Sequence, residues 1–393
     1  MMDKNNRYLR ILIYAQHLSG VGHYVRTFEI ARALASHHEV YWVEGGRPVP
    51  HAPCSALRIV ELPRIQRDPD GGLCGVEPDG DIKARMDRRA ALLLEAVDRI
   101  RPDAFLIEYF PFSKWELGGE LLPAINAARA QGTKVLCSLR DVVRKTRFEV
   151  ADNYSEKVID LLNHHFDALF VHADPTLTRL GEHFPDVPGI KLPIHHTGLV
   201  SEKLEPSPGT AGDIAEITAG QPFVIVSAGG GAGGQRLMTR VIGAWQKPGF
   251  ADGRLLVVCA GLGWPETLMK NLAAQCAGGN IVLLPFREDF LHWLAAADLS
   301  ISQCGYNTAA NLLETRTPAI VCPNMDMSDQ PFRARRLAEL GLVELFDPDD
   351  GADRLLDAIG RALSRGRSAH AIDLDGAAQT GKVIEGGVQI PTG

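Results

Sequence analysis

Short apolar runs alternate with amphipathic helical segments along nearly the whole chain, and this alternation restricts the folds open to it. Between residues 24 and 36, apolar side chains recur at a three-residue step, as on one face of a helix. Strands that alternate with helices predict βαβ units around a parallel sheet, and therefore an α/β protein. The expected strands lie at residues 10–15, 39–43, 57–62, 104–108, 134–139 and 168–171, and then at 223–227, 254–260, 281–284, 299–302 and 319–322.

A break in this pattern separates the two series of strands. Residues 201–221 are rich in Pro, Gly, Ser and Thr, which is typical of an interdomain linker. A chain of 393 residues is long enough for two domains with sizeable cores. We therefore predict two doubly wound, Rossmann-like domains that face a cleft, with ligands beyond the carboxyl ends of the strands. The predicted ranges are 1–205 for the first domain, 206–221 for the linker, 222–370 for the second domain, and 371–393 for a tail that could pack back on the first domain.

Composition argues against several other classes of protein. The formal net charge is −7 and no long Lys/Arg run is present, so a nucleic acid is not an expected partner. The seven cysteines lack C-x-x-C spacing, which favours reduced core thiols over a disulfide framework or a zinc site. Neither a signal peptide nor an apolar stretch of about 18 residues is visible, so we expect no transmembrane segment and a cytoplasmic location.

The first candidate site lies between the first strand and the helix that follows it. Residues 19–26 read Ser-Gly-Val-Gly-His-Tyr-Val-Arg. Gly20 and Gly22 permit a tight turn with room for a ligand. His23 then falls at the start of the helix, where a neutral imidazole could accept a proton from a hydroxyl group. Helix capping or packing is the alternative role for His23, and the flanking glycines favour the functional one.

A second glycine cluster follows the strand at residues 223–227. Residues 229–234 read Gly-Gly-Gly-Ala-Gly-Gly and match G-x-G-x-x-G, in which backbone N–H groups at a helix start can hold a diphosphate. We assign Gly230, Gly231 and Gly233 to this role. A nicotinamide-binding fold would also need an acidic residue at the end of the next strand, which here ends Val-Cys-Ala-Gly at 258–261. The pattern favours a phosphate site over a dinucleotide site, with a plain flexible turn as the alternative.

A third group of candidates lies within residues 284–334, in the order that one βαβαβ path would produce. Gly305 and Thr308 predict a second strand-to-helix turn with free N–H groups. Asn311 would lie one helical turn further along, and Gln330 would begin another helix at the end of the next strand. These loops can converge, because the carboxyl ends of parallel strands meet at one edge of a sheet.

This third segment resembles the donor-binding half of the family 28-like glycosyltransferases, which have the GT-B fold. The likeness rests on the glycine cluster at 229–234, on residues 286–287, on Cys-Gly-Tyr-Asn-Thr at 304–308, and on Gln330. It implies a nucleotide-sugar donor, with a UDP-sugar favoured. The residues that it implies at the donor, besides the glycines, are Phe286, Arg287, Gly305, Asn307, Thr308, Asn311, Asp329 and Gln330.

The first half of the chain is similar to the acceptor-binding half of the same family. Its glycine turn matches the acceptor-side glycine loop, and the stretches at 101–103, 139–141, 172–175 and 196–200 resemble a less characterised bacterial branch of glycosyltransferases. The resemblance implies an inverting transfer of a hexosyl group to an acceptor hydroxyl, with His23 as the general base. It implies an acceptor-side role for Gly20, Gly22, Arg140 and Asp141.

Position 311 departs from the family pattern. The family has a glutamate that grips both ribose hydroxyls, whereas this chain has Asn311, and an amide oxygen is a weaker acceptor than a carboxylate. Glu314, on a nearby helical face, could partly substitute. Three D-x-D stretches, at 68–70, 347–349 and 373–375, lie in turn-like contexts, which favours turn formation over a metal site. We expect no metal and no cofactor, since the nucleotide-sugar is a co-substrate.

Two other functions stay open. The pattern G-x-G-H-x-x-R at residues 20–26 also resembles the start of hydrolases that release a sugar from its nucleotide. A non-catalytic nucleotide-sugar-binding protein would keep the donor loops and dispense with His23. The acceptor hydroxyl could belong to a small molecule, a glycan or a lipid, and a lipid acceptor is compatible with a peripheral position at the inner face of the membrane.

Overall fold

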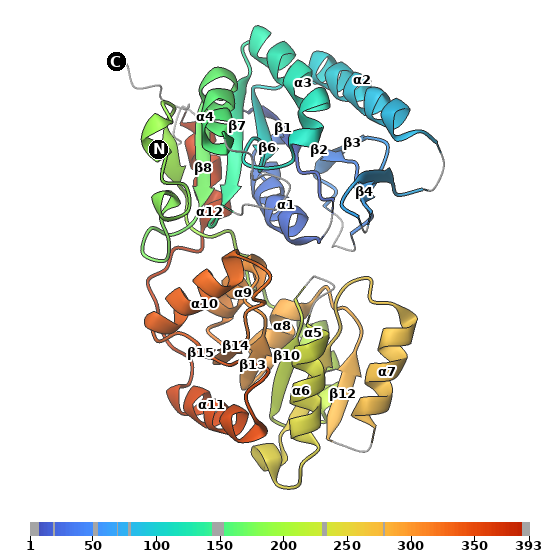
Figure 1. The fold of residues 1–393 in the computed structure, drawn as a ribbon, viewed down its shortest axis with the longest axis vertical. Helices are drawn as coiled ribbons and strands as arrows, with labels where there is room; N and C mark the ends of the chain where they lie inside the picture. Colours follow the sequence, from blue (N-terminus) through green and yellow to red (C-terminus); the bar gives the residue numbers. More distant parts are fainter. Residues whose placement is uncertain are drawn as a thin grey trace. The chain divides into compact units, whose positions relative to one another are not determined.

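The computed structural model describes residues 8–18, 20–49, 54–68, 70–77, 80–143, 153–229, 234–277 and 280–386. The chain divides into two compact units, shown in Figure 1. Unit 1 comprises Met1–Val200 and Asp375–Gly393, and unit 2 comprises Ser201–Leu374. Each unit has its own hydrophobic core and a parallel sheet. Among the described residues, no helix has both the length and the apolar character needed to cross a membrane.

Unit 1 is built on a seven-stranded parallel sheet in the order β3-β2-β1-β6-β7-β8-β9. Its strands are β1 (Arg10–Tyr14), β2 (Glu39–Glu44), β3 (Leu57–Glu61), β6 (Ala104–Glu108), β7 (Lys134–Arg140), β8 (Ala168–His172) and β9 (Ile194–His196). Its helices are α1 (Gly22–Ala35), α2 (Ile82–Ile100), α3 (Gly118–Ala130), α4 (Tyr154–His165) and α12 (Gly376–Glu385). Every residue of β6 and β8 is buried, because a central parallel strand is covered on both faces.

Unit 2 contains a six-stranded parallel sheet in the order β12-β11-β10-β13-β14-β15. Its strands are β10 (Phe223–Ser227), β11 (Leu255–Cys259), β12 (Ile281–Leu284), β13 (Leu299–Ser302), β14 (Ala319–Val321) and β15 (Glu344–Leu345). Its helices are α5 (Pro208–Thr218), α6 (Gln235–Trp245), α7 (Glu266–Cys276), α8 (Phe290–Ala296), α9 (Tyr306–Thr315), α10 (Asp329–Glu339) and α11 (Ala352–Arg365). From the middle of the sheet, β10, β11 and β12 follow one another to one edge, and β13, β14 and β15 follow one another to the other edge. The winding therefore reverses between the adjacent strands β10 and β13.

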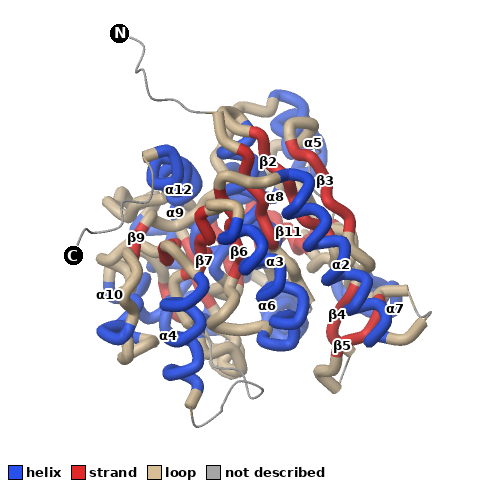
Figure 2. Tube along the Cα trace, turned by 90° about the horizontal axis from the view of Figure 1, so that it is seen from above, coloured by secondary structure: helices blue, strands red, loops and turns tan. Residues whose placement is uncertain are grey.

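Two segments differ from the sequence-based expectation. The stretch expected to be a linker, 206–221, contains α5, which begins with Pro208 in the first helical position and buries Ile214. Residues 65–75, where the sequence predicted no strand, form an antiparallel hairpin of β4 (Ile65–Arg67) and β5 (Leu73–Gly75), which Figure 2 shows beside one end of α2. The sequence did not predict these elements, because neither the helix that begins at Pro208 nor the short polar hairpin has a strong apolar periodicity.

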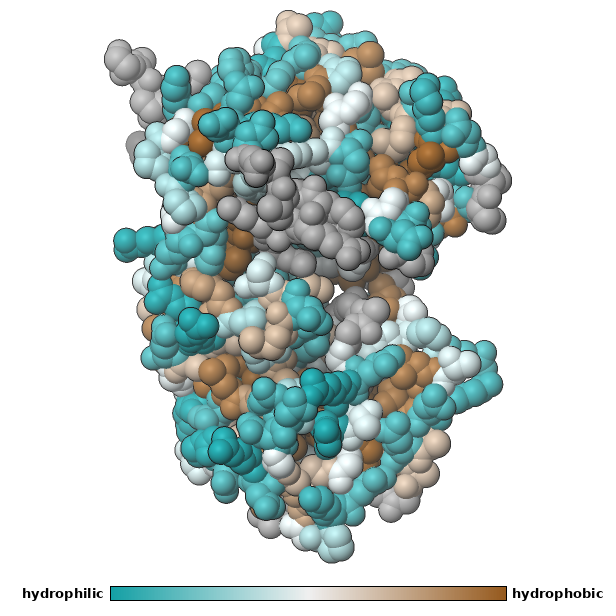
Figure 3. Space-filling view, in the orientation of Figure 1, coloured by the Kyte–Doolittle hydropathy of each residue, from teal (hydrophilic) through white to brown (hydrophobic). Residues whose placement is uncertain are grey.

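The C-terminal helix α12 belongs to unit 1 and packs against α1. Nε2 of His38, just beyond α1, lies 3.0 Å from Oε1 of Glu385. On the face drawn in Figure 3, hydrophilic residues cover much of the surface of each unit, and apolar residues are interspersed among them.

Candidate active site

In unit 1, a buried carboxylate at the carboxyl end of β6 holds three other side chains. The side chain of Glu108 is fully buried. Nδ1 of His23 lies 2.6 Å from its Oε1, and Arg26 donates to the same oxygen at 2.5 Å. Lys114 donates to Oε2 at 2.5 Å. His23 and Arg26 reach one carboxylate because residues three apart lie on the same face of α1.

Burial and neighbouring charges set the protonation of this cluster. Burial alone would raise the pKa of Glu108, but His23, Lys114 and Arg26 lower that pKa well below its usual value. Burial lowers the pKa of His23 to about 4, although Glu108 opposes this change. Near pH 7 the carboxylate is therefore ionised and the imidazole is neutral. An ionised Glu108 selects the tautomer with the proton on Nδ1, and Nε2 of the ring, whose side chain is 23% exposed, can then accept a proton.

The predicted acceptor-side residues lie around this cluster. Gly22 is the first residue of α1, directly before His23, and Gly20 lies in the turn that leads into the helix. The ring of Tyr109 lies 4.9 Å from that of His23, and the guanidinium of Arg140 lies 5.6 Å from the centroid of the Tyr109 ring. Asp141 is 1% exposed and accepts the backbone N–H of Val142 at 2.8 Å.

A second buried carboxylate of unit 1 has a different partner. Glu120 on α3 accepts two hydrogen bonds from Arg89 on α2, both at 2.8 Å. Arg89 also donates to the carbonyls of Gly45 at 3.2 Å and Pro63 at 2.7 Å, in the loops after β2 and β3. This pair ties two helices to two loops. The Arg89–Glu120 pair is therefore a second buried ion pair of unit 1, and its contacts join helices to loops.

In unit 2, the described ends of the glycine cluster lie next to the Gly305 turn. Gly229 and Gly234 have φ values of 68° and 99°, which favour glycine. A Cβ atom at Gly229 would lie 3.1 Å from Oγ1 of Thr308, in the first turn of α9. Gly305 is the N-cap residue of α9, and Asn307 lies in the first turn of that helix. The predicted contacts of Gly230, Gly231 and Gly233 lie outside the described residues.

Two predicted donor residues at the start of α10 have partners within the protein. Oε1 of Gln330 accepts the backbone N–H groups of Cys304 at 3.2 Å and Asn324 at 2.9 Å. Asp329 is 4% exposed and accepts a hydrogen bond from Arg333 at 3.2 Å. Gln330 therefore joins two loops of unit 2, whereas Asp329 pairs with Arg333 within α10, and sequence motifs alone revealed neither role.

The remaining donor candidates lie at the same edge of the unit 2 sheet. Phe286 and Arg287 follow β12, and Arg287 pairs with Asp289 through two hydrogen bonds of 2.8 and 2.6 Å. Asn311 is partly buried in the second turn of α9. Glu314, which the sequence suggested as a partial substitute for Asn311, forms an ion pair with Lys203 at 3.1 Å. That ion pair directs the carboxylate to the segment before α5.

Two of the three D-x-D stretches, at 68–70 and 347–349, form local turn contacts. Asp68 accepts the backbone N–H of Gly72 at 2.8 Å, and Asp347 accepts that of Asp349 at 2.9 Å. Within the described ranges, no group of three or more His, Cys, Asp and Glu side chains is placed to hold a metal ion.

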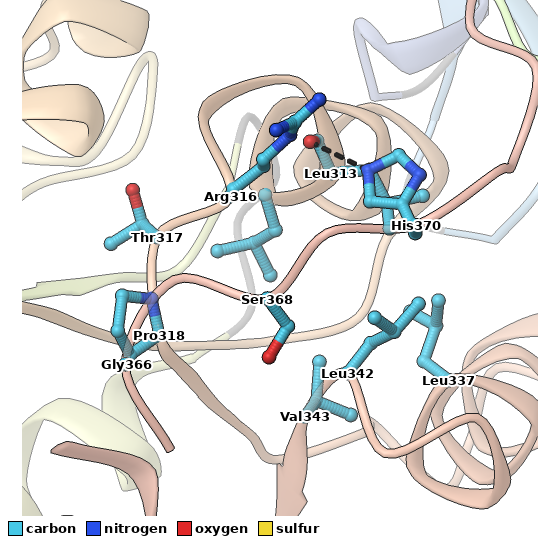
Figure 4. A pocket seen from close by; sticks show the side chains of 11 residues that line it. Leu313, Arg316, Thr317, Pro318, Leu337, Leu342, Val343, Gly366, Ser368 and His370 are labelled. Atoms are coloured by element: carbon cyan, nitrogen blue, oxygen red, sulfur yellow. Dashed lines mark hydrogen bonds between the residues drawn. The ribbon is translucent and has the colours of Figure 1, made fainter. Parts of the chain in front are cut away.

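A small cavity of unit 2, drawn in Figure 4, lies near the C-terminal ends of α9 and α10, away from the predicted donor residues at their N-terminal ends. Its lining includes Leu313, Arg316, Leu337 and His370, and Nε2 of His370 lies 2.9 Å from the carbonyl oxygen of Leu313. Its volume of about 20 Å³ is close to that of one water-sized site, so it is too small for a sugar or a nucleotide.

Sequence reasoning missed Glu108, Lys114 and Arg333. Glu108 had one available signal, because it ends a fully apolar strand, and a charged residue there faces the ligand edge of a parallel sheet. His172 ends β8 in the same way and is fully buried, with Nε2 2.8 Å from Oγ of Ser138 and Nδ1 2.8 Å from Oγ1 of Thr197. Burial lowers the pKa of His172 to about 3, so it is a neutral part of the core.

Comparison with known proteins finds a family match within unit 2. Residues 224–372 match the model of the glycosyltransferase family 28 C-terminal domain. A segment of 133 residues, 32% of this chain, is 33% identical to the UDP-N-acetylglucosamine--N-acetylmuramyl-(pentapeptide) pyrophosphoryl-undecaprenol N-acetylglucosamine transferase of Desulforudis audaxviator (strain MP104C). The match spans 35% of that relative's length, about a third.

Similarity to solved structures extends over both units. MurG from Acinetobacter baumannii is similar with a TM-score of 0.56 at 16% identity, over 96% of this chain and 99% of that one. UDP-GlcNAc 2-epimerase from Methanocaldococcus jannaschii is similar with a TM-score of 0.63 at 11% identity, over 97% of this chain and 100% of that one. Identities this low show the fold alone. The family match is therefore confined to residues 224–372 of unit 2, and the fold of the whole chain is similar to that of GT-B glycosyltransferases such as MurG.

Proposed function

We propose that this protein is a glycosyltransferase that moves a sugar from a nucleotide-sugar, with UDP as the favoured nucleotide, to an acceptor hydroxyl. The observation that carries the proposal is the neutral His23 at the start of α1, held through Nδ1 by the buried, ionised Glu108. The family 28 match supports a donor site in unit 2. The convergence of Gly229, Gly305 and Thr308 supports the same assignment.

In the proposed reaction, the acceptor binds unit 1 and Nε2 of His23 takes the proton of its hydroxyl. The acceptor oxygen attacks the anomeric carbon, and the bond from that carbon to the diphosphate breaks. The bonding electrons leave with the nucleoside diphosphate. A single displacement of this kind inverts the anomeric centre. Glu108 stabilises the imidazolium that His23 becomes, because an opposite charge beside a buried cation lowers its free energy.

The leaving diphosphate would be stabilised by backbone N–H groups at the starts of α6 and α9. Both helices have at least ten residues, and the first N–H groups of a helix have no partner within it. Together with the helix dipole, these groups favour a bound anion. We therefore propose that the reaction needs no metal ion. Charge that develops on the leaving group would be met by fixed dipoles of the protein.

The first experiment identifies the donor. The protein is incubated with a panel of nucleotide-sugars, with and without small-molecule, glycan and lipid-linked acceptors, and the nucleoside diphosphate and the sugar products are measured. A lipid-linked acceptor belongs in the panel because the name of the Desulforudis relative includes pyrophosphoryl-undecaprenol. Free sugar that forms whatever acceptor is present would indicate a hydrolase instead. A changed sugar that stays on its nucleotide would indicate an epimerase.

His23→Ala then tests the base. General-base catalysis contributes ~10²–10⁴-fold, so kcat should fall by about that factor while donor affinity, which depends on unit 2, stays unchanged. His37→Ala is the matched control, because His37 is an exposed histidine just beyond the end of the same helix. Full turnover in His23→Ala with its acceptor would remove His23 from the mechanism. Binding of the donor with no turnover under any condition would favour the non-catalytic alternative.

A further inference from the structure

Side chains of α10 hold the peptide groups of the Cys304 turn from two directions. Gln330 accepts the N–H of Cys304 at 3.2 Å, and Nη1 of Arg333 donates to the carbonyl oxygen of Cys304 at 2.6 Å. Gln330 also accepts the N–H of Asn324 at 2.9 Å, in the loop after β14. The residue that precedes the N-cap of α9 is therefore connected through both its amide and its carbonyl group to one helix.

Arg333 is itself held on several sides. It is 1% exposed, and its Nη2 donates to Oδ2 of Asp329 at 3.2 Å, one helical turn earlier. Its guanidinium carbon lies 5.8 Å from the centroid of the Tyr306 ring. A planar guanidinium with a carboxylate, a carbonyl and an aromatic ring around it has little freedom to move. Asp329 offsets the charge that would otherwise be buried alone.

The turn that Arg333 holds is the one that would receive the donor. Gly305 and Tyr306 follow Cys304 directly, and Thr308, in the first turn of α9, lies beside Gly229. An anion is bound more tightly when the N–H groups that receive it are already in place, because binding then costs less ordering entropy. The position of the Cys304 carbonyl decides where these groups point, since it is covalently joined to the Gly305 amide.

We infer that Arg333, held by Asp329, is a positioning residue that preorders the Cys304–Tyr306 turn for the nucleotide diphosphate. The inference rests on the proposed donor site, and it makes Asp329 the counter-ion of Arg333 in place of a direct donor contact. Arg333 acts through the turn, because its guanidinium binds the Cys304 carbonyl and the Asp329 carboxylate.

The test is calorimetric titration of the full chain with UDP. Arg333→Met keeps an unbranched side chain and removes both charged hydrogen bonds, so UDP should bind about tenfold more weakly or worse, as expected for loss of a preordering hydrogen bond to a charged group. Arg335→Met is the matched control on α10, since Arg335 is exposed, and it should bind UDP as the wild type does. Thermal unfolding of each variant shows that titrations are made well below its melting temperature.

A kinetic readout separates positioning from simple loss of stability. In Arg333→Met, KM for the nucleotide-sugar should rise about tenfold, while kcat at saturating donor changes much less, because a misplaced turn weakens binding of the donor. A merely structural role would lower the melting temperature and leave KM unchanged. If Arg333→Met does not fold, Arg333→Lys and Asp329→Asn decide the question. Arg333→Lys replaces the planar guanidinium by a single ammonium group, and Asp329→Asn removes the counter-ion of Arg333.

The outcomes distinguish this inference from the proposed function. Wild-type binding of UDP together with unchanged affinity in the folded Arg333 variants would overturn the inference and leave the donor site standing. If the wild type binds neither UDP nor another nucleoside diphosphate, the donor site itself is wrong and the inference fails with it. Weaker binding in the Arg333 and Asp329 variants but not in Arg335→Met would establish Arg333 as a positioning residue.

Discussion

Glu108→Gln is the substitution that tests the His23 site most directly. The amide has nearly the shape of the carboxylate but has no charge and only one acceptor oxygen. Arg26 and Lys114, whose side chains are 1% and 9% exposed, then lose their counter-ion. Removal of one partner from a buried ion pair costs ~3–5 kcal/mol. Because the amide oxygen still accepts one hydrogen bond, we expect a loss of about 3 kcal/mol in the free energy of unfolding.

The effect on the rate follows from the tautomer of His23. In the wild type, the ionised Glu108 accepts the Nδ1 proton, which leaves Nε2 as the base. In the variant, the amide group can donate to Nδ1 and so favour the tautomer with its proton on Nε2, which cannot accept another from the acceptor. We therefore expect kcat to fall by ~10²–10⁴-fold, close to the loss in His23→Ala. The affinity for UDP should stay unchanged, because the donor residues belong to unit 2.

The assay measures kcat with saturating donor and acceptor, and urea denaturation measures the free energy of unfolding. Glu120→Gln is the matched control, since Glu120 is also a buried carboxylate of unit 1 with an arginine partner. It should lose comparable stability and keep its kcat below its melting temperature. The double variant His23→Ala/Glu108→Gln should be no slower than His23→Ala, because the two residues act as one unit. Equal kcat values in Glu108→Gln and Glu120→Gln, or a multiplicative loss in the double variant, would refute the reasoning.

Three further predictions address pH, metal and nucleotide. Burial lowers the pKa of His23 from 6.5 to about 4, so kcat/KM should stay level down to about pH 5 and fall as pH drops through about 4, and an acid limb near 6.5 would contradict this. Between these pKa values the unfolded chain binds more protons, so the free energy of unfolding should also decrease from pH 6.5 to 4. Turnover should persist in excess EDTA, and a loss that magnesium or manganese restores would disprove metal independence. Asn311→Glu should tighten UDP binding about tenfold, since hydrogen bonds to charged groups contribute ~1.5–3 kcal/mol against ~1 for neutral ones, and unchanged calorimetric affinity would place Asn311 away from the ribose.

The alternation of apolar runs and helical faces was enough to predict the α/β class and nearly all strands of the two sheets. The strand expected at residues 104–108 and the structure's β6 have the same bounds, because a fully buried parallel strand must be continuously apolar. Gly229 and Gly234, which follow β10, marked one strand-to-helix turn, since their positive φ values favour a residue without a Cβ atom. Each of these signals is local in the chain.

The partners of the charged residues could be decided only by the tertiary structure. Glu108 is 85 residues from His23, and Arg333 is 29 residues from Cys304, and no local pattern in either segment indicates the other. The same holds for Glu314, whose ion pair with Lys203 is not indicated by any local pattern. A helix or strand is specified by neighbours a few residues away, whereas a buried ion pair depends on which elements the sheet order brings together. Burying a charge costs free energy unless a partner of opposite charge lies beside it. The charged groups of both candidate sites therefore depend on how the helices and strands pack.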